Sequence, residues 1–142
     1  DKRWTINVGE RDCGKGVFTI LLKKAFGFFV GEFSANTFLN KTNIQDPEKD
    51  LAWCVPNIRK RMMISNEMKA DGKETCDGIK AKMFASGGDC IPMRKNYGDP
   101  ITRQPQFSLV FMANKVPKVE PADALSNCDI LSYKSYNFAK QM

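Results

Sequence analysis

The segment from Gly9 to Gly16, which reads GERDCGKG, constrains the fold of this chain more than any other feature. It matches the pattern Gly-x4-Gly-Lys, which is typical of a loop that wraps around phosphate groups. Residues 4–8 before it alternate as a β-strand does, and residues 17–26 after it suit a helix that ends at Gly27. A strand, a glycine loop and a helix N-terminus together present backbone N–H groups and partial positive charge to an anion.

The loop therefore predicts a site for a nucleoside triphosphate. Lys15 is the cation placed to reach the terminal phosphates, and Mg²⁺ is the expected companion of ATP. Gly16 departs from the pattern, because a Ser or Thr hydroxyl at this position normally binds the metal ion. We expect nucleotide binding to tolerate this change better than hydrolysis does. The predicted ATP-binding residues are Gly9, Glu10, Arg11, Asp12, Cys13, Gly14, Lys15, Gly16 and Val17.

Length and composition limit the remaining possibilities. The chain has 142 residues, of which 42% are hydrophobic, and this suits one domain with its own core. No apolar run approaches 18 residues, so we expect no membrane span. The net charge of +6 favours a polyanionic partner. The chain opens with DKRW and without an initiator methionine, and we interpret it as a fragment of a larger protein.

The cysteine pattern argues against a zinc site and against a disulfide framework. The count is odd, the spacing is wide, no Cys-x2-Cys pair occurs, and the chain has no histidine. Scattered thiols of this kind fit a reducing compartment. Cys13 lies inside the glycine loop, where a small variable residue is the favoured interpretation and a redox-sensitive thiol the alternative. The five residues are Cys13, Cys54, Cys76, Cys90 and Cys128.

Strand-like and helix-like segments alternate along the chain, which predicts a parallel α/β sheet covered on both faces. The alternation gives no sign of an internal repeat or a domain boundary. Beyond the first strand and helix, we expect strands at 28–33, 61–65, 107–113 and 129–133, helices starting near Pro47 and spanning 76–84, and loops at 34–46, 70–75 and 91–104.

Two of the expected strands end in polar residues that suit phosphate chemistry. Glu67 follows the buried-type strand 61–65 and is the predicted general base that activates a water molecule. Asn66 stands where a metal-binding acid often lies, and we assign both residues to Mg²⁺ through water. Asn114 follows the strand 107–113 and is predicted to hold the γ-phosphate or the attacking water. The alternatives are an ordinary core strand that ends in a polar loop and an Asn that begins a turn.

A basic segment with one aromatic residue lies between glycine and proline at 87–99. Arg94 and Lys95 are predicted to follow a phosphate backbone, and Tyr97 to pack or stack against a base. We therefore predict DNA-binding roles for these three residues. A solvated hairpin with no partner is the alternative interpretation.

In this order, the segments resemble the superfamily 3 helicases, and among them the primase-helicases of poxviruses, other large DNA viruses and phages. Residues 4–27 look like motif A, 51–67 like the helix and strand of motif B, 79–97 like motif B′, and 106–117 like motif C. The resemblance implies a P-loop NTPase with an AAA+-like parallel sheet flanked by helices. It also implies a β-hairpin insertion before the strand that carries the sensor Asn114, with the basic hairpin lining a central pore.

The resemblance further implies ATP-driven unwinding of DNA, bound as a single strand or a fork, by a homo-oligomeric and usually hexameric ring. On this basis residues 1–142 are expected to be one ATPase core domain, with a C-terminal lid and an upstream primase region outside it. The expected location is a cytoplasmic replication site in a virus-infected cell.

Residues 123–129 depart from the family, because they contain no arginine where members supply an arginine finger to the neighbouring subunit. Lys115 and Lys118 are weak substitutes. This departure and Gly16 leave two alternatives open. One is a hydrolysis-impaired nucleotide-binding subunit that serves as a DNA-binding or structural platform. The other is a P-loop kinase or GTPase of another class.

Overall fold

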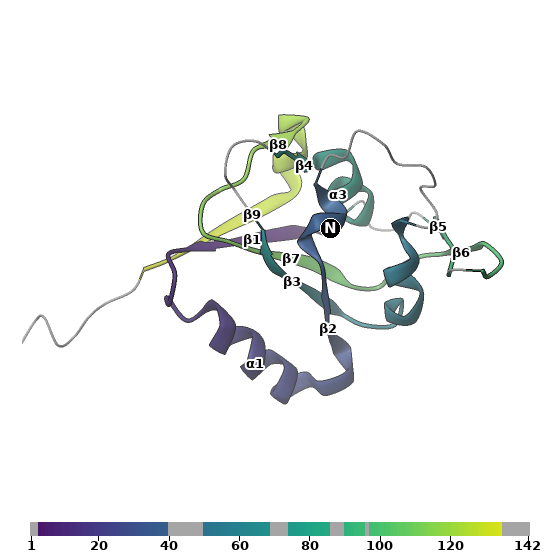
Figure 1. Ribbon diagram of the computed structural model, residues 1–142, viewed down its shortest axis with the longest axis horizontal. Coiled ribbons are helices and arrows are strands. Elements are labelled where there is room, and N and C mark those ends of the chain that lie inside the picture. Colours follow the sequence, from purple (N-terminus) through teal and green to yellow (C-terminus); the bar gives the residue numbers. More distant parts are fainter. Residues whose placement is uncertain (1–2, 40–49, 69–73, 86–89, 96, 135–142) are drawn as a thin grey trace, which may run out of the picture.

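A computed structural model of the chain describes residues 3–39, 50–68, 74–85, 90–95 and 97–134. Its centre is a five-stranded sheet in the order β2-β3-β7-β1-β9 (Figure 1). Every neighbouring pair of these strands is parallel, so the predicted parallel α/β fold is confirmed. The strands are β1 (Trp4–Gly9), β2 (Val30–Phe33), β3 (Met62–Met68), β7 (Ser108–Ala113) and β9 (Cys128–Tyr133).

Helices cover both faces of the sheet, but unequally. Helix α1 (Lys15–Phe26) lies on one face, and α3 (Gly78–Ala85) lies on the other, beside a short strand pair (Figure 1). That pair is parallel and consists of β4 (Cys76–Asp77) and β8 (Val119–Glu120). Within the described residues, four 3-10 helices complete the layers: η1 (Gly27–Phe29), η2 (Ala35–Phe38), η3 (Ala52–Asn57) and η4 (Ala122–Asn127).

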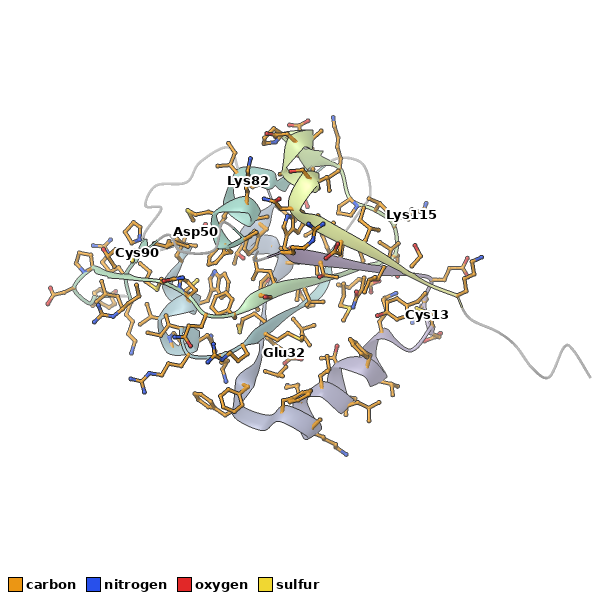
Figure 2. All side chains as sticks on the ribbon, turned by 180° about the vertical axis from the view of Figure 1, so that it is seen from behind. Cys13, Glu32, Asp50, Lys82, Cys90 and Lys115 are labelled. Atoms are coloured by element: carbon orange, nitrogen blue, oxygen red, sulfur yellow. The ribbon has the colours of Figure 1, made fainter. Side chains whose placement is uncertain are left out.

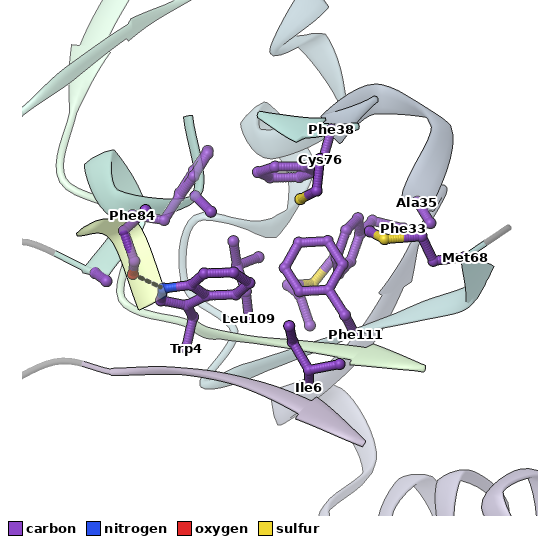
Figure 3. Packing of buried hydrophobic residues seen from close by; sticks show 14 of the residues in the cluster. Trp4, Ile6, Phe33, Ala35, Phe38, Met68, Cys76, Phe84, Leu109 and Phe111 are labelled. Carbon is purple, nitrogen blue, oxygen red and sulfur yellow. Dashed lines mark hydrogen bonds between the residues drawn. The ribbon is translucent and has the colours of Figure 1, made fainter. Parts of the chain in front are cut away.

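The main core lies on the α3 side of the sheet and is rich in aromatic rings (Figure 3). Phe111 makes edge contacts with Trp4, at a centroid distance of 5.6 Å, and with Phe38, at 5.1 Å. The indole Nε1–H of Trp4 donates to the carbonyl of Ala124 at 3.2 Å, so the buried ring has a partner for its one polar atom. These contacts fix β1, β7 and η4 relative to one another.

The α1 side of the sheet has a much smaller core. Its buried residues are Val30, Ile64, Val110 and Met112, with Leu22 of α1 packed against them. No residue of α1 is itself buried. The outer surface of the helix and of η1 is therefore apolar and exposed at Val17, Ile20, Leu21, Phe26, Phe28 and Phe29.

Several expected elements change in extent. Residues 28–29 belong to η1, and β2 begins at Val30. Cys76 and Asp77, expected in a helix, form β4 instead. The helix begins at Gly78 because the Asp77 carboxylate accepts the backbone N–H of Lys80 at 3.0 Å, as an N-terminal cap does.

The segment expected to be a turn-rich loop contains the β-hairpin that the family resemblance implies. Strands β5 (Ile91–Met93) and β6 (Ile101–Arg103) pair antiparallel and precede β7 in the chain. Near Pro47, where a helix start is expected, residues 40–49 lie outside the described part; Asp50, the first described residue after them, is α-helical, and η3 begins at Ala52. Among the described helices, none is both long and apolar enough to cross a bilayer.

A charged pair lies within the α3 layer. The Lys80 ammonium contacts the Asp50 carboxylate and donates to the carbonyl of Thr37 at 2.5 Å. It also lies 5.1 Å from the centre of the Phe38 ring. Lys80 is 9% exposed, so its charge depends on these partners for the stabilisation that water would otherwise provide.

We predict that Lys80→Met lowers the free energy of unfolding by about 2–4 kcal/mol, because the carboxylate loses its partner. Urea denaturation followed by tryptophan fluorescence measures the change. The double variant Lys80→Met/Asp50→Leu is the control, and it should recover most of the loss because both charges are gone. A double variant no more stable than the single one would show that the charge pair is not what Lys80 contributes.

Candidate nucleotide site

The loop between β1 and α1 folds back on its own first residue. A Cβ atom on Gly9 would lie 2.5 Å from the Cys13 sulfur, 3.1 Å from Tyr133 Cβ and 3.3 Å from the Tyr133 carbonyl oxygen, so a side chain there would displace Cys13 and press on β9. Gly14 has a φ of 95°, a conformation that glycine adopts without steric cost. The carbonyl of Gly14 accepts the N–H of Phe18 at 3.0 Å, which closes the first turn of α1.

Lys15 lies at the centre of this loop. Its ammonium donates to the carbonyl of Gly9, to that of Glu10 at 3.1 Å and to Asn114 Oδ1 at 3.4 Å. The Cys13 sulfur lies 3.6 Å from the same nitrogen. The cation is thus held over the loop by uncharged acceptors, and a phosphate oxygen would be a stronger partner than any of them.

The N-terminus of α1 favours an anion at the same place. No side chain caps it, and its first turn carries no acidic residue. Its first N–H groups therefore keep their partial positive charge and have no capping side chain to satisfy them. Together with Lys15, they make the loop a place where negative charge is stabilised.

The end of β3 contains a β-bulge that determines which side chain faces the loop. Ile64 pairs with Val110, but Met112 pairs with Glu67, so β3 has one residue more than β7 over this stretch. Ser65 occupies the bulge, where its hydroxyl accepts the N–H of Met112 at 2.9 Å and donates to the carbonyl of Asn66 at 2.7 Å. Glu67 consequently takes the position opposite Met112 that Asn66 would have in a regular strand.

Two adjoining cavities border the loop, and Lys15, Gly16 and Glu67 line both of them. The first, of about 410 Å³, is otherwise lined by Arg11, Asp12, Cys13, Gly14, Val17 and Asn114. The second, of about 330 Å³, is otherwise lined by Thr19, Ile20, Lys23, Glu32, Ser65, Asn66 and Met112. The predicted residues at the ends of β1, β3 and β7 are thus brought together around one loop.

The side chains around Gly16 supply only some of the oxygen ligands that a metal ion needs. Gly16 supplies no hydroxyl, and Asn66 Oδ1 already accepts the N–H of Ala35 at 2.7 Å. Glu67 is exposed, and its carboxylate is of the type that Mg²⁺ prefers. Among the described residues, no group of three or more metal-binding side chains is clustered. A metal ion here would depend on Glu67, on water and on phosphate oxygens.

Sequence analysis missed two contributors to this site. Ser65 holds the bulge, and nothing in its sequence context distinguishes it from any other strand residue. Glu32 lines the second cavity and forms an ion pair with Lys23 at 3.0 Å. The sequence did contain a signal for Glu32. Side chains of a strand alternate between its two faces, so a single acidic residue in an otherwise apolar strand marks the face that is open to solvent or to a ligand.

The predicted DNA-binding residues lie in the connection between β5 and β6. The N–H of Gly98 donates to the carbonyl of Lys95 at 3.0 Å and closes a turn. Within that turn Tyr97 has a φ of 60° and a fully exposed ring, and Lys95 is also exposed. Arg94 is half-buried. The glycine motif at 87–88 lies outside the described residues.

The hairpin and the glycine loop lie at opposite ends of the molecule. Figure 2 labels Cys13 within the loop at one end and Cys90, just before β5, at the other. Residues 123–129, where family members supply an arginine, form most of η4 and the start of β9, which pack near α3 and β1. Lys118 pairs with Glu120 at 3.1 Å.

The five cysteines are free and differ in environment. Burial raises the pKa of Cys76 to about 12 and that of Cys128 to about 12, and it also raises the pKa of Cys54. These three thiols are therefore protonated at neutral pH and poorly reactive. Cys13 is half-buried beside Lys15, and Cys90 is exposed.

Comparison with known proteins supports the resemblance to helicases. The chain is 30% identical over 135 residues to "Putative helicase V13" of the Sputnik virophage. The match covers 94% of this chain and 17% of that protein, so the chain spans less than a fifth of its relative. No protein-family model matches the chain.

Two solved structures share the fold of this chain. The C-terminal region of NrS-1 aligns with a TM-score of 0.61 at 13% identity, over 94% of this chain and 28% of that one. The JCV helicase aligns with a TM-score of 0.65 at 11% identity, over 99% of this chain and 38% of that one. The resemblance to a viral helicase domain is thereby confirmed, and the fold is that of a P-loop NTPase.

The glycines of the loop lead to a paired prediction. A Cβ atom on Gly16 would meet no atom within 4 Å, whereas one on Gly9 would clash with Cys13. We expect Gly16→Thr to retain nucleotide affinity and to strengthen its dependence on Mg²⁺. Gly9→Ala should weaken the affinity about tenfold or more, as expected when a loop loses the geometry that holds its ligand.

Calorimetric titration with ATP, with and without Mg²⁺, measures both variants. Loss of binding in Gly16→Thr would mean that this glycine is required for backbone geometry and that the missing hydroxyl is not the important difference.

Proposed function

We propose that this chain is the ATP-hydrolysing motor domain of a viral DNA helicase. The observation that supports it most is the meeting of Lys15, Glu67 and Asn114 around one glycine loop, although they come from the start of α1, the end of β3 and the residue after β7. The similarity to a virophage helicase relative points to the same class of protein.

In this proposal, each residue of the site has a separate role. The loop and the N-terminus of α1 bind the β- and γ-phosphates, and Lys15 exchanges its carbonyl partners for phosphate oxygens. Glu67 accepts the proton of the attacking water, and Asn114 orients that water or the γ-phosphate. Mg²⁺, when bound, neutralises charge on the phosphates, and Glu67 would hold it through water, because the Asn66 oxygen already binds the backbone at Ala35.

A hydrolysis-impaired subunit is the second candidate function, and two observations favour it. Gly16 leaves the metal without a hydroxyl ligand, and the segment at 123–129 offers no arginine to a neighbouring subunit. Such a subunit would bind ATP and DNA but would turn ATP over slowly. Turnover measured with and without single-stranded DNA separates the two candidates, and phosphoryl transfer to a small acceptor would instead indicate a kinase.

DNA is the proposed polymer partner. In this proposal several copies of the chain assemble into a ring, six being the expected number, and the β5–β6 hairpins face its central pore. The net charge of +6 favours a polyanion in this position. The proposed location is a cytoplasmic replication site in an infected cell.

We predict that Glu67→Gln lowers ATP turnover by about 10²–10⁴-fold while ATP remains bound, because the amide keeps the shape of the side chain but cannot accept the proton. Lys15→Ala should abolish ATP binding itself, since the cation in the loop is lost. Release of inorganic phosphate measures ATP turnover, and calorimetry measures ATP binding. Glu120→Gln on β8 is the control for removing an exposed acid. Unchanged turnover in Glu67→Gln would place the base elsewhere.

We predict that Arg94→Ala/Lys95→Ala weakens single-strand binding and lowers its salt dependence, while sparing ATP affinity at the other end of the molecule. Each cation that neutralises a phosphate of single-stranded DNA contributes about 0.7 to the slope of log K against log salt. The control is Lys24→Ala/Arg59→Ala, which removes the same charge from other exposed positions. Equal slopes for the two double variants would reject the hairpin as the DNA contact.

A further inference from the structure

An aromatic pair borders the glycine loop on the side away from Glu67. Tyr133 is the last residue of β9, and Phe18 lies in the first turns of α1. Their ring centres are 6.4 Å apart, with an interplanar angle of 47°. Tyr133 pairs with Gly9 in the β1–β9 register, and its Cβ lies 3.1 Å from where a Cβ on Gly9 would be. The pair therefore stands directly beside the start of the loop.

Both rings have surface that a ligand could contact. Phe18 is 38% exposed, and Tyr133 is half-buried at the edge of the sheet. The rings meet at an angle, so they form a bent wall and leave no closed slot between them. A flat aromatic ligand would lie against this wall and bury apolar surface that is otherwise in water.

The order of the strands gives a bound triphosphate its direction. Glu67 on β3 and Asn114 after β7 lie on one side of β1, while Tyr133 on β9 lies on the other. Lys15 contacts Asn114 and, with Glu67, lines the same cavity. The most highly charged end of the ligand belongs beside Lys15 and those polar groups. Its uncharged nucleoside end must then point toward β9.

We propose that Tyr133 and Phe18 form the wall against which the nucleobase stacks, an inference that rests on the proposed function of the loop as a triphosphate site. Stacking on aromatic rings holds any base, because every base has a π-face. The wall thus separates nucleotides from inorganic polyphosphates and discriminates little between one purine and another.

Two ligands that share the phosphate chain test this inference. ATP and inorganic tripolyphosphate are titrated calorimetrically into the wild-type chain, Tyr133→Ala and Phe18→Ala. We expect Tyr133→Ala to weaken ATP binding about tenfold, which is within the range measured for loss of a base-stacking ring. Tripolyphosphate affinity should stay unchanged. Tyr133→Phe should bind ATP as the wild type does, and Phe28→Ala, which removes an exposed ring at the far end of α1, is the matched control.

A fluorescent base analogue reports stacking directly. The triphosphate of 2-aminopurine riboside should lose fluorescence when it binds the wild-type chain and keep more of it with Tyr133→Ala at saturating protein. Circular dichroism spectra establish that each variant is folded. If Tyr133→Ala unfolds, Tyr133→Phe takes its place in the test, because its aromatic ring must still quench the fluorescence of the bound analogue.

The outcomes test the aromatic wall and the triphosphate site separately. Equal affinities of the wild type for ATP and tripolyphosphate, or equal losses of both ligands in Tyr133→Ala, would overturn the stacking wall and leave the triphosphate site in place. Failure of the wild-type chain to bind either ligand would overturn the proposed function, and the wall with it.

Discussion

The β-bulge at the end of β3 is the constraint on which the candidate site depends. It rests on the Ser65 hydroxyl, which accepts a hydrogen bond from the backbone of β7 and donates one to its own strand. In a regular strand the side chain opposite Met112 would come from Asn66, and an amide cannot take a proton from water. With one extra residue in β3, Glu67 stands opposite Met112 and lines the same cavities as Lys15. The oxygen of Asn66 is used instead to bind the backbone at Ala35.

The two layers around the sheet have different roles. The α3 layer contains most of the buried aromatic rings and holds the parallel strands in register, so it keeps the carboxyl ends of β1, β3 and β7 level at one edge. The α1 layer buries little apolar surface and contributes mainly its N-terminus to the site. A helix held by few buried contacts can adjust its position at small cost, because little apolar area is lost when it moves. This property suits an element whose first turn is proposed to bind a phosphate.

The separation of loop and hairpin matters for the proposed motor. Strand β7 connects the two ends of the molecule, since β6 leads into its start and Asn114 follows its end. Its residues from Leu109 to Ala113 are buried, so close packing restrains the strand between the hairpin and the proposed phosphate site. In the proposed motor, β7 is the continuous element that joins the hairpin to the candidate nucleotide site.

The sequence by itself determined the strand, glycine loop and helix, because Gly-x4-Gly-Lys requires particular backbone conformations that few residues permit. Its apolar runs also predicted the five parallel strands, although the boundaries moved at Phe28 and Cys76 where turns and caps compete with strand and helix. Only the tertiary structure decided that the bulge at Ser65 presents Glu67, that Glu32 reaches the second cavity and that Tyr133 stands beside Gly9. These positions depend on register between strands that are far apart in sequence, and a local pattern carries no information about register.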